Sequence, residues 1–565
     1  MNLGVTFAFI LRKTDHVISN LATYSPDLAM KIKKIPAILL LIPLLAFSRC
    51  QKRGLTPVAS TETATETNVK DTAGVTLRNM FGVNGYEWNV LQDPNNVNDA
   101  SKVYEPKWAI IKGLGSFRHY MDWEKLESEQ GNYTFNPVHS GGWNYDAIYL
   151  RAKQDSVFML ADLKTVPGWF LNKFYPADQR DAEDVPAPYT ADKSDPASYI
   201  LQGKVAFQFA ARYGYNSAVD RSLVTVNTTP RWTADLVNEV KIGMGLVKYI
   251  ECDNERDKWW KGTKAQQTGQ QYAANMSAFY DGNQGKLGKD VGVKSADPNM
   301  LVVMGGLANA DVQFVKDMID WCRTNRGYRE DGSVNLCFDV INYHFYSNNG
   351  GASVNSVATK ALAPELSRSG EVADGFVKLG KSNNLPVWVT ETGYDLNPSS
   401  SQSAPKIGDK SALLTQADWS LRTSLLYARH GVGRLFFFQM YDDTPNGGGT
   451  YMTSGLVEQN NTRRPSADYM VQVNKLMGNY AYARTINADP IVDKYISGKK
   501  AIYALMVPDQ TGRTASYVLN LDGAKSASIY TLKVGADAPV KTTVATTNGK
   551  LTITVTETPV FVQAN

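Results

Sequence analysis

Between about Gly74 and residue 480, short apolar runs alternate with longer segments of helical periodicity. Continuous apolar runs are typical of parallel strands that are buried on both faces. Their alternation with helices predicts a parallel sheet of βα units, and eight units suit a closed (β/α)8 TIM barrel. The predicted strands are Met80–Asn84, Leu114–Tyr120, Val157–Leu163, Val247–Asp253, Leu301–Gly305, Val340–His344, Val387–Thr390 and Arg434–Gln439.

Two of the intervening segments have a clear helical pattern. Pro196–Tyr213 gathers apolar side chains on one face, and Leu413–His430 ends at Gly431, a typical helix C-terminal residue. The stretch from Asn172 to about Pro196 is rich in Asp, Pro and Ala and predicts an elaborated loop. We interpret this loop as surface decoration on the barrel.

The pattern changes after about residue 481, where short alternating strands are separated by Gly, Asn and Asp turns. This pattern predicts an antiparallel β-sandwich over residues 481–565, after a barrel over residues 73–480. Because no Pro/Ser/Thr-rich linker separates them, the sandwich should pack on the barrel. Four of its strands are predicted at Ala501–Val507, Ala515–Asn520, Ser528–Val534 and Leu551–Val555.

The N-terminal region resembles an export signal. Residues 30–49 join a basic start, from Met30, to an apolar run of 13 residues that is too short for an ordinary transmembrane helix. Residues 1–29 then precede the true start, and residues 50–72 form a flexible tether. Cys50 is a candidate for lipidation and membrane anchoring, and cleavage after Ser48 is the alternative. We therefore expect an exported protein at the cell surface, in the periplasm or secreted.

Charge and cysteine content exclude several classes of protein. Residues 1–49 hold six Lys or Arg and two Asp or Glu, which accounts for the formal net charge of +4. The remainder is neutral and has no basic stripe, so we expect no nucleic-acid partner. Three cysteines after Cys50 are too few for a disulfide scaffold, and Cys322 with Cys337 is the favoured pair for a single bridge. The five His residues show no paired ligand spacing, so we predict no metal and no cofactor.

Carboxylates follow two of the predicted strands at the end where barrel enzymes build their sites. The fourth strand runs into Glu251, Asp253, Asn254 and Glu255, and the seventh delivers Glu391. Glycoside hydrolysis needs one acid to protonate the departing oxygen and one anion to face the oxocarbenium-like carbon. Glu251 is the better candidate for a buried partner of a cation such as Arg118.

The pattern Glu251-x-x-Asn254-Glu255, with Thr390-Glu391-x-Gly393, resembles the strand-4 and strand-7 motifs of the clan A glycoside hydrolases, and families 39, 5 and 30 are nearest. The resemblance covers roughly residues 80–475. One departure is Arg256, which stands where clan members usually have Pro. Further similar segments are Arg118, Trp123 to Phe135, Arg212-Tyr213-Gly214 and His344-Phe345-Tyr346.

The resemblance implies a retaining β-glycoside hydrolase with Glu255 as acid/base and Glu391 as nucleophile. Asn254 would bind the sugar 2-hydroxyl, and Tyr346 would hold Glu391. The alternatives are a non-catalytic surface glycan-binding protein on the same barrel and a metal-dependent hydrolase. No sequence feature selects one sugar, endo or exo action, or an oligomeric state. Five further residues are substrate-binding candidates. Arg118 would add positive potential, and His344 would contact the substrate or Tyr346. Trp259 and Trp260 would stack on a sugar ring, and Gln439 would line the pocket of the cleaved sugar.

Overall fold

The computed structural model of the chain describes residues 74–97, 100–139, 141–230, 237–351, 357–445 and 447–565. The predicted signal peptide, the tether and Cys50 lie outside these residues. Within the described part, no helix is both long and apolar enough to cross a membrane.

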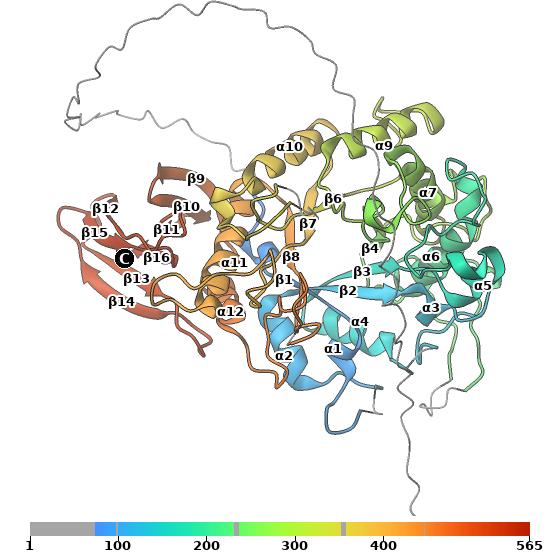
Figure 1. Cartoon of the computed structure of the whole chain (residues 1–565), viewed down its shortest axis with the longest axis horizontal. Coiled ribbons are helices and arrows are strands. Elements are labelled where there is room, and N and C mark those ends of the chain that lie inside the picture. The colour runs from blue at the N-terminus through green and yellow to red at the C-terminus, as the bar shows by residue number, and fades with distance from the viewer. Residues whose placement is uncertain (1–73, 98–99, 140, 231–236, 352–356, 446) are drawn as a thin grey trace, which may run out of the picture. The chain divides into compact units, whose positions relative to one another are not determined.

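Eight parallel strands form a ring in the order β5-β4-β3-β2-β1-β8-β7-β6 (Figure 1). Isolated bridges from Val303 to Val340 and from Leu307 to Tyr343 join β5 to β6 and close the barrel. All eight predicted strands are confirmed, with ends that differ by no more than two residues. The strands are β1 Gly82–Gly85, β2 Ser116–Asp122, β3 Phe158–Lys164, β4 Tyr249–Cys252, β5 Leu301–Met304, β6 Ile341–His344, β7 Val387–Glu391 and β8 Arg434–Phe437.

A long helix follows each barrel strand and covers its outer face. The two predicted helical segments correspond to α6 and α11. Two of the helices begin at typical caps: α11 starts after Ser411, whose side chain accepts the amide of Leu414, and α7 starts with a capping box at Thr268. The eight helices are α2 Glu105–Leu114, α4 Tyr145–Gln154, α6 Ile200–Tyr213, α7 Gly269–Asp281, α9 Val312–Asn325, α10 Ser369–Ser382, α11 Ala412–Arg429 and α12 Pro465–Met477. Shorter helices are α1 Trp88–Leu91, α3 Trp123–Leu126, α5 Gly168–Phe174 and α8 Val293–Ala296.

The C-terminal strands form two antiparallel sheets that enclose an apolar core, which confirms the predicted sandwich. Six strands follow the order β14-β13-β16-β11-β10-β9, and β12 pairs with β15. The core between them includes Val492, Leu505, Leu519, Ile553 and Val562. The strands are β9 Ala481–Ala488, β10 Ile491–Ser497, β11 Lys500–Met506, β12 Ala515–Asn520, β13 Ser526–Thr531, β14 Val540–Ala545, β15 Lys550–Val555 and β16 Val560–Ala564.

The sandwich lies beside α11 and α12 and is bonded to both (Figure 1). Arg429 of α11 donates to the buried carboxylate of Asp493 at 2.7 and 3.0 Å. Gln472 of α12 donates to the carbonyl of Lys533 at 2.6 Å. These hydrogen bonds join helices of the barrel to the sandwich, and the two domains belong to one compact unit.

The three cysteines of the described residues are buried free thiols. Cys322 and Cys337 lie next to each other, with their Sγ atoms 3.4 Å apart, which is a contact distance and not a bond. The favoured pair is therefore adjacent and unbridged in this structure.

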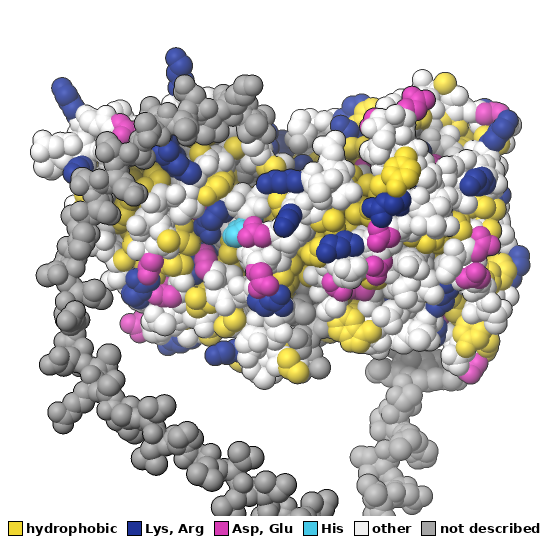
Figure 2. All heavy atoms as spheres, turned by 90° about the horizontal axis from the view of Figure 1, so that it is seen from above, with side chains coloured by type: hydrophobic (Ala, Val, Ile, Leu, Met, Phe, Trp, Pro, Cys, Tyr) yellow, Lys and Arg dark blue, Asp and Glu magenta, His cyan; other side chains and the backbone are white. Residues whose placement is uncertain are grey.

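One face of the molecule carries mixed charges. Figure 2 shows Lys and Arg side chains interspersed there with Asp and Glu side chains. A nucleic-acid-binding surface instead gathers basic side chains into a patch or stripe. This face differs from such a surface.

We predict that Asp493→Ala lowers the free energy of unfolding by about 3 kcal/mol, because it leaves the mostly buried Arg429 without its carboxylate. Asp537→Ala is the matched control, since Asp537 also pairs with a barrel arginine, Arg463, but its side chain is 67% exposed. The control should lose less than about 1 kcal/mol. Urea unfolding of both variants measures the difference, and equal losses would contradict the prediction.

Candidate active site

Inside the barrel, side chains change from apolar to polar toward the carboxyl ends of the strands. Leu160, Val303, Val340, Trp388 and Phe436 form a buried cluster nearer the amino ends. Strand side chains alternate between faces, so the inward residue two positions further along each strand forms the next layer. That layer is polar and fully buried, and it includes Asn84, Arg118, Asp162, Glu251, Asn342 and Thr390.

Arg118 of β2 lies at the centre of this polar layer. Its guanidinium donates to both carboxylate oxygens of Glu251, at 2.7 and 2.9 Å, which confirms the predicted pair. It also reaches Asp162 at 2.9 Å and Glu391 at 3.0 Å. Burial, together with the negative charge of Glu251, raises the pKa of Asp162 well above its usual range despite Arg118.

Glu391 ends β7 and is held as an anion. Its Oε1 accepts from Tyr120 at 2.5 Å and from Arg118 at 3.0 Å, and its Oε2 accepts from Tyr346 at 3.0 Å. Burial acts to raise its pKa, but the charges of His344 and Arg118 and the two phenol hydrogen bonds outweigh burial and lower it. An anionic carboxylate with fixed orientation is suited to act as a nucleophile.

Glu255 lies just beyond β4 on a strained turn. Asp253 and Glu255 have φ angles of 67° and 53°, a left-handed conformation that non-glycine residues adopt rarely and mostly at functional sites. The Glu255 amide donates to the carbonyl of Gly306 at 3.0 Å, which fixes the turn. Burial raises the pKa of Glu255, although a hydrogen bond from His344 opposes the shift. Glu255 is thus the carboxyl that tends to stay protonated.

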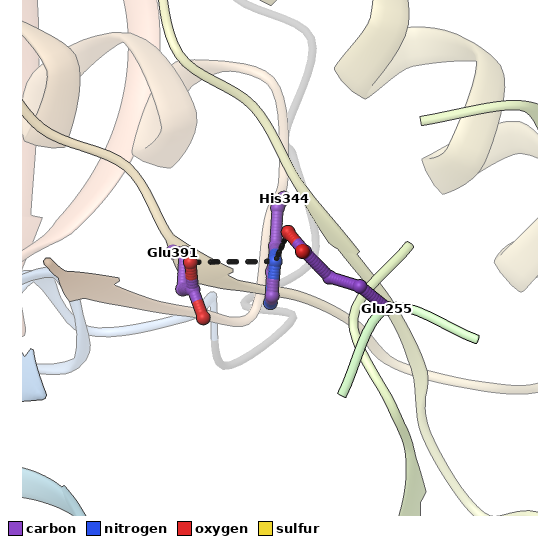
Figure 3. Close-up of side chains that lie close together, drawn as sticks. All are labelled: Glu255, His344 and Glu391. Carbon is purple, nitrogen blue, oxygen red and sulfur yellow. Dashed lines mark hydrogen bonds and ion pairs between the residues drawn. The ribbon is translucent and has the colours of Figure 1, made fainter. Parts of the chain in front are cut away.

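His344 lies between the two glutamates (Figure 3). Its Nδ1 is 2.8 Å from Glu255 Oε1 and 3.5 Å from Glu391 Oε2, and its Nε2 is 3.1 Å from Thr390 Oγ1. Both ring nitrogens of His344 thus lie within hydrogen-bond distance of these partners, and its contact with substrate or Tyr346 stays a prediction. A Cβ at Gly306 would lie 2.0 Å from Nε2, so only glycine leaves room for the ring.

The separation of the two carboxylates limits the reaction they can perform. One oxygen of Glu255 and one of Glu391 lie within 4.8 Å of each other. Retaining glycosidases need about 5–5.5 Å between carboxyl groups, and inverting enzymes need about 6.5–9.5 Å to admit a water molecule. Nearest oxygens within 4.8 Å are compatible with the closer of these two spacings.

A cavity of about 360 Å³ opens over the two glutamates. Asn254, Tyr346 and Trp260 line it, as predicted for substrate-binding residues, and Arg118 holds Asn254 Oδ1 at 2.9 Å from below. Trp259 lies behind Trp260, edge-on, with ring centroids 5.0 Å apart. The remaining wall includes Tyr86, Tyr120, Lys164, Glu183, Lys258, Lys261, Phe438 and Tyr451.

Gln439 does not line this cavity, so its predicted position in the pocket is wrong. It lines a neighbouring cavity of about 660 Å³ with Trp88 and Tyr441, while Phe438 lines the cavity over the glutamates.

Arg256 connects the β4 turn to the loop at residues 172–196. Its guanidinium is fully buried, pairs with Asp253 at 2.8 Å and donates to the carbonyls of Asp184 and Glu183 at 3.0 and 3.2 Å. The loop therefore supplies Glu183 to the cavity wall. The interpretation of this loop as surface decoration is corrected, since a buried arginine in place of the usual proline ties it to the site.

Sequence reasoning missed several residues of the cavity. Tyr120 could have been found, because it lies two positions after Arg118 and so faces the same side of β2. Lys164 could have been found in the same way, because it ends β3 two positions after the inward-facing Asp162. Tyr451 and Glu183 come from long loops, in which no periodicity predicts where a side chain points.

Glu255, His344 and Glu391 are the one group of described His, Cys, Asp and Glu residues whose atoms are close enough to hold a metal ion together. A cation there would have to displace the bond between His344 and Glu255 and would lie against Arg118, which contacts Glu391 at 3.0 Å. The positive guanidinium opposes such binding. The group fits a pair of carboxyls better than a metal site.

No protein-family profile and no curated protein match this chain. Among solved structures, it is similar to a family 39 glycoside hydrolase from the gut symbiont Bacteroides cellulosilyticus WH2, with a TM-score of 0.56, 15% identity, and coverage of 86% of this chain and 81% of that chain. It is also similar to a family 51 α-L-arabinofuranosidase from Bifidobacterium longum, with a TM-score of 0.51, 12% identity, and coverage of 89% and 98%. At such low sequence identity, these likenesses show the fold alone. At the level of the fold, they confirm the predicted resemblance to clan A.

We predict that Arg256→Ala speeds amide hydrogen exchange in residues 181–187 by about tenfold or more, because the buried hydrogen bonds to two loop carbonyls are lost. Exchange in β4 should change little. Arg323→Ala, which removes an exposed arginine of α9, is the control and should leave the loop unchanged. Unaltered loop exchange in a folded Arg256→Ala protein would contradict the role given to this arginine.

Proposed function

We propose that this chain is a retaining β-glycoside hydrolase that cleaves a poly- or oligosaccharide through a glycosyl-enzyme intermediate. The observation that carries the proposal is the pair Glu255 and Glu391, within 4.8 Å and with pKa values shifted in opposite directions. One protonated and one ionised carboxyl at this separation are what double displacement needs. The β configuration rests on the clan resemblance.

In the first step, Glu391 attacks the anomeric carbon while Glu255 donates its proton to the departing oxygen. Tyr120, Tyr346 and Arg118 orient the attacking carboxylate through its two oxygens. The negative charge of Glu391 is consumed as the covalent bond forms. Glu255 becomes anionic at the same time, so the site keeps its total charge.

In the second step, Glu255 accepts a proton from water, which attacks the anomeric carbon from the side the leaving group has vacated. His344 stabilises the new Glu255 anion, because its Nδ1 lies 2.8 Å from Oε1. Asn254 lies in the cavity beside Glu255, where its amide nitrogen can donate to the sugar 2-hydroxyl. Both displacements invert the carbon, so the product retains its configuration.

The proposal includes export. The basic start and short apolar run of residues 30–49 support a signal peptide, and Cys50 supports a lipid anchor at the cell surface. Labelling with a radioactive fatty acid tests the anchor, and Cys50→Ala is expected to abolish the label if Cys50 carries it.

We predict that Glu391→Ala reduces turnover at least about 10⁴-fold without loss of fold. Glu255→Ala should still form the intermediate from activated aryl glycosides but hydrolyse it slowly, because no base activates water. Azide, a small anion that needs no base, should then restore turnover and give a β-glycosyl azide. Proton NMR of the earliest wild-type product should show the β anomer.

Three results would contradict these roles. They are near-normal activity of a folded Glu391→Ala variant, an initial α anomer from a β substrate, and Glu255→Ala turnover that azide does not change. Asp493→Ala serves as the control for indirect effects, since it perturbs stability far from the cavity.

We predict that His344→Phe moves both limbs of the pH–activity profile upward. His344 lowers the pKa of Glu255 through its hydrogen bond and lowers that of Glu391 through its charge. The acidic limb reports loss of the Glu391 anion, and the basic limb reports loss of the Glu255 proton, so each limb follows its carboxyl to higher pH. His430→Phe, outside the cavity, should shift neither limb. A profile that only falls in height would contradict the assignment.

A further inference from the structure

Beyond Glu255 the chain runs along one wall of the catalytic cavity. Lys258, Trp260 and Lys261 line this wall, within six residues of the acid/base. Glu255 protonates the departing oxygen in the proposed reaction, so this wall borders the leaving-group part of the substrate. Glu391 in the same cavity is bonded by Tyr120 and Tyr346, and the lining there also includes Phe438 and Tyr451.

Lys258 is a buried cation without a hydrogen bond to its ammonium among the described residues. Its side chain is only 4% exposed, and the carboxylate nearest to it, Glu183 Oε2, lies 3.7 Å away. That distance allows an ion pair but is too long for a hydrogen bond. A buried ammonium that lacks hydrogen bonds is costly, so the cavity offers three unused donors at this point.

The surrounding charges leave Lys258 short of negative partners. Glu183 is shared with Lys261 at 3.3 Å, and Asp253 bonds the buried Arg256 at 2.8 Å. Burial and the charge of Arg256 lower the pKa of Lys258, although Asp253, Glu183 and Glu255 oppose the shift. An anionic group on a ligand would supply the missing negative charge and accept the free hydrogen bonds.

Trp260 provides an apolar surface in the same cavity as this ammonium. Its side chain is 42% exposed and lines the same cavity, and Trp259 supports it edge-on. An exposed indole face packs against the apolar face of a sugar ring, and a nearby cation can then bind a charged substituent of that ring.

We propose that the leaving-group side of the cavity binds a sugar bearing an anionic substituent, a uronate carboxylate or a sulfate ester, with Lys258 as its hydrogen-bond donor and Trp260 as its stacking surface. This inference rests on the proposed function, because the role of Glu255 defines the leaving-group side. It assigns an acidic glycan as the substrate class.

The test compares three sets of β-linked oligosaccharides with the same backbone: neutral, uronate-substituted and O-sulfated. For the wild-type protein, KM for one acidic set should be at least about tenfold lower than for the neutral set. Lys258→Met should remove this preference, so that KM for the acidic set is no longer lower than for the neutral set, and Lys258→Arg should keep it. The acidic set that responds identifies the carboxylate or the sulfate.

Two further variants separate a ligand-binding lysine from a structural one. Lys264→Met is the matched control, since Lys264 lies in the same segment and faces Asp184 at 3.6 Å but does not line the cavity. It should leave the preference intact. Glu183→Gln removes the carboxylate that competes for Lys258 and should lower KM for the acidic set. If Lys258→Met fails to fold, Glu183→Gln provides the test, and an unchanged KM for the acidic set would overturn the proposal.

Equal KM values for acidic and neutral sets in the wild-type protein would also overturn the inference, and so would equal effects of the Lys258 and Lys264 variants. Turnover of neutral aryl β-glycosides without an acidic preference would leave the proposed function standing and refute only this inference. Calorimetric binding of the acidic set that depends on Lys258, with no hydrolysis of any glycoside, would refute only the proposed function.

Discussion

The guanidinium of Arg118 joins the carboxyl ends of five barrel strands. It bonds Asn84 on β1, Asp162 on β3, Glu251 and Asn254 at the end of β4, and Glu391 on β7, and it is itself on β2. A planar group with five donors can satisfy such a set only if the strand ends keep fixed relative positions. The same contact that balances the buried carboxyls therefore sets the geometry of Glu391.

Opposite protonation of the two glutamates follows from their surroundings and not from their chemistry. Both side chains are buried, which alone would raise both pKa values. Glu391 escapes this effect because a cation and two phenols bond its oxygens, whereas His344 is the side chain that hydrogen-bonds Glu255 among the described residues. The proton then belongs to Glu255, and His344, between them, couples the two titrations.

The barrel strands could be predicted because each is buried on both faces and is therefore an apolar run in the sequence. Glu251, Glu255 and Glu391 could be located because charged residues interrupt such runs only at strand ends. The pairing of Glu251 with Arg118 followed from the same reasoning. Other contacts between strand ends could not be predicted: His344 meets Glu255 because β6 and the β4 turn converge, and Gln439 lines a neighbouring cavity and not the one over the glutamates. The edge strands β9 and β14 are mostly exposed and carry no apolar alternation to mark them.

Arg256, which stands where clan members usually have proline, has a structural role of its own in this chain. A proline after Glu255 would fix the local backbone but could bond nothing, whereas the arginine reaches back to Asp253 and outward to the carbonyls of Glu183 and Asp184. The left-handed turn that presents Glu255 is thus held by the same side chain that anchors the 172–196 loop. The positions of this loop and of Glu255 are thus linked through one buried cation, so a shift of the loop would disturb the turn that carries Glu255.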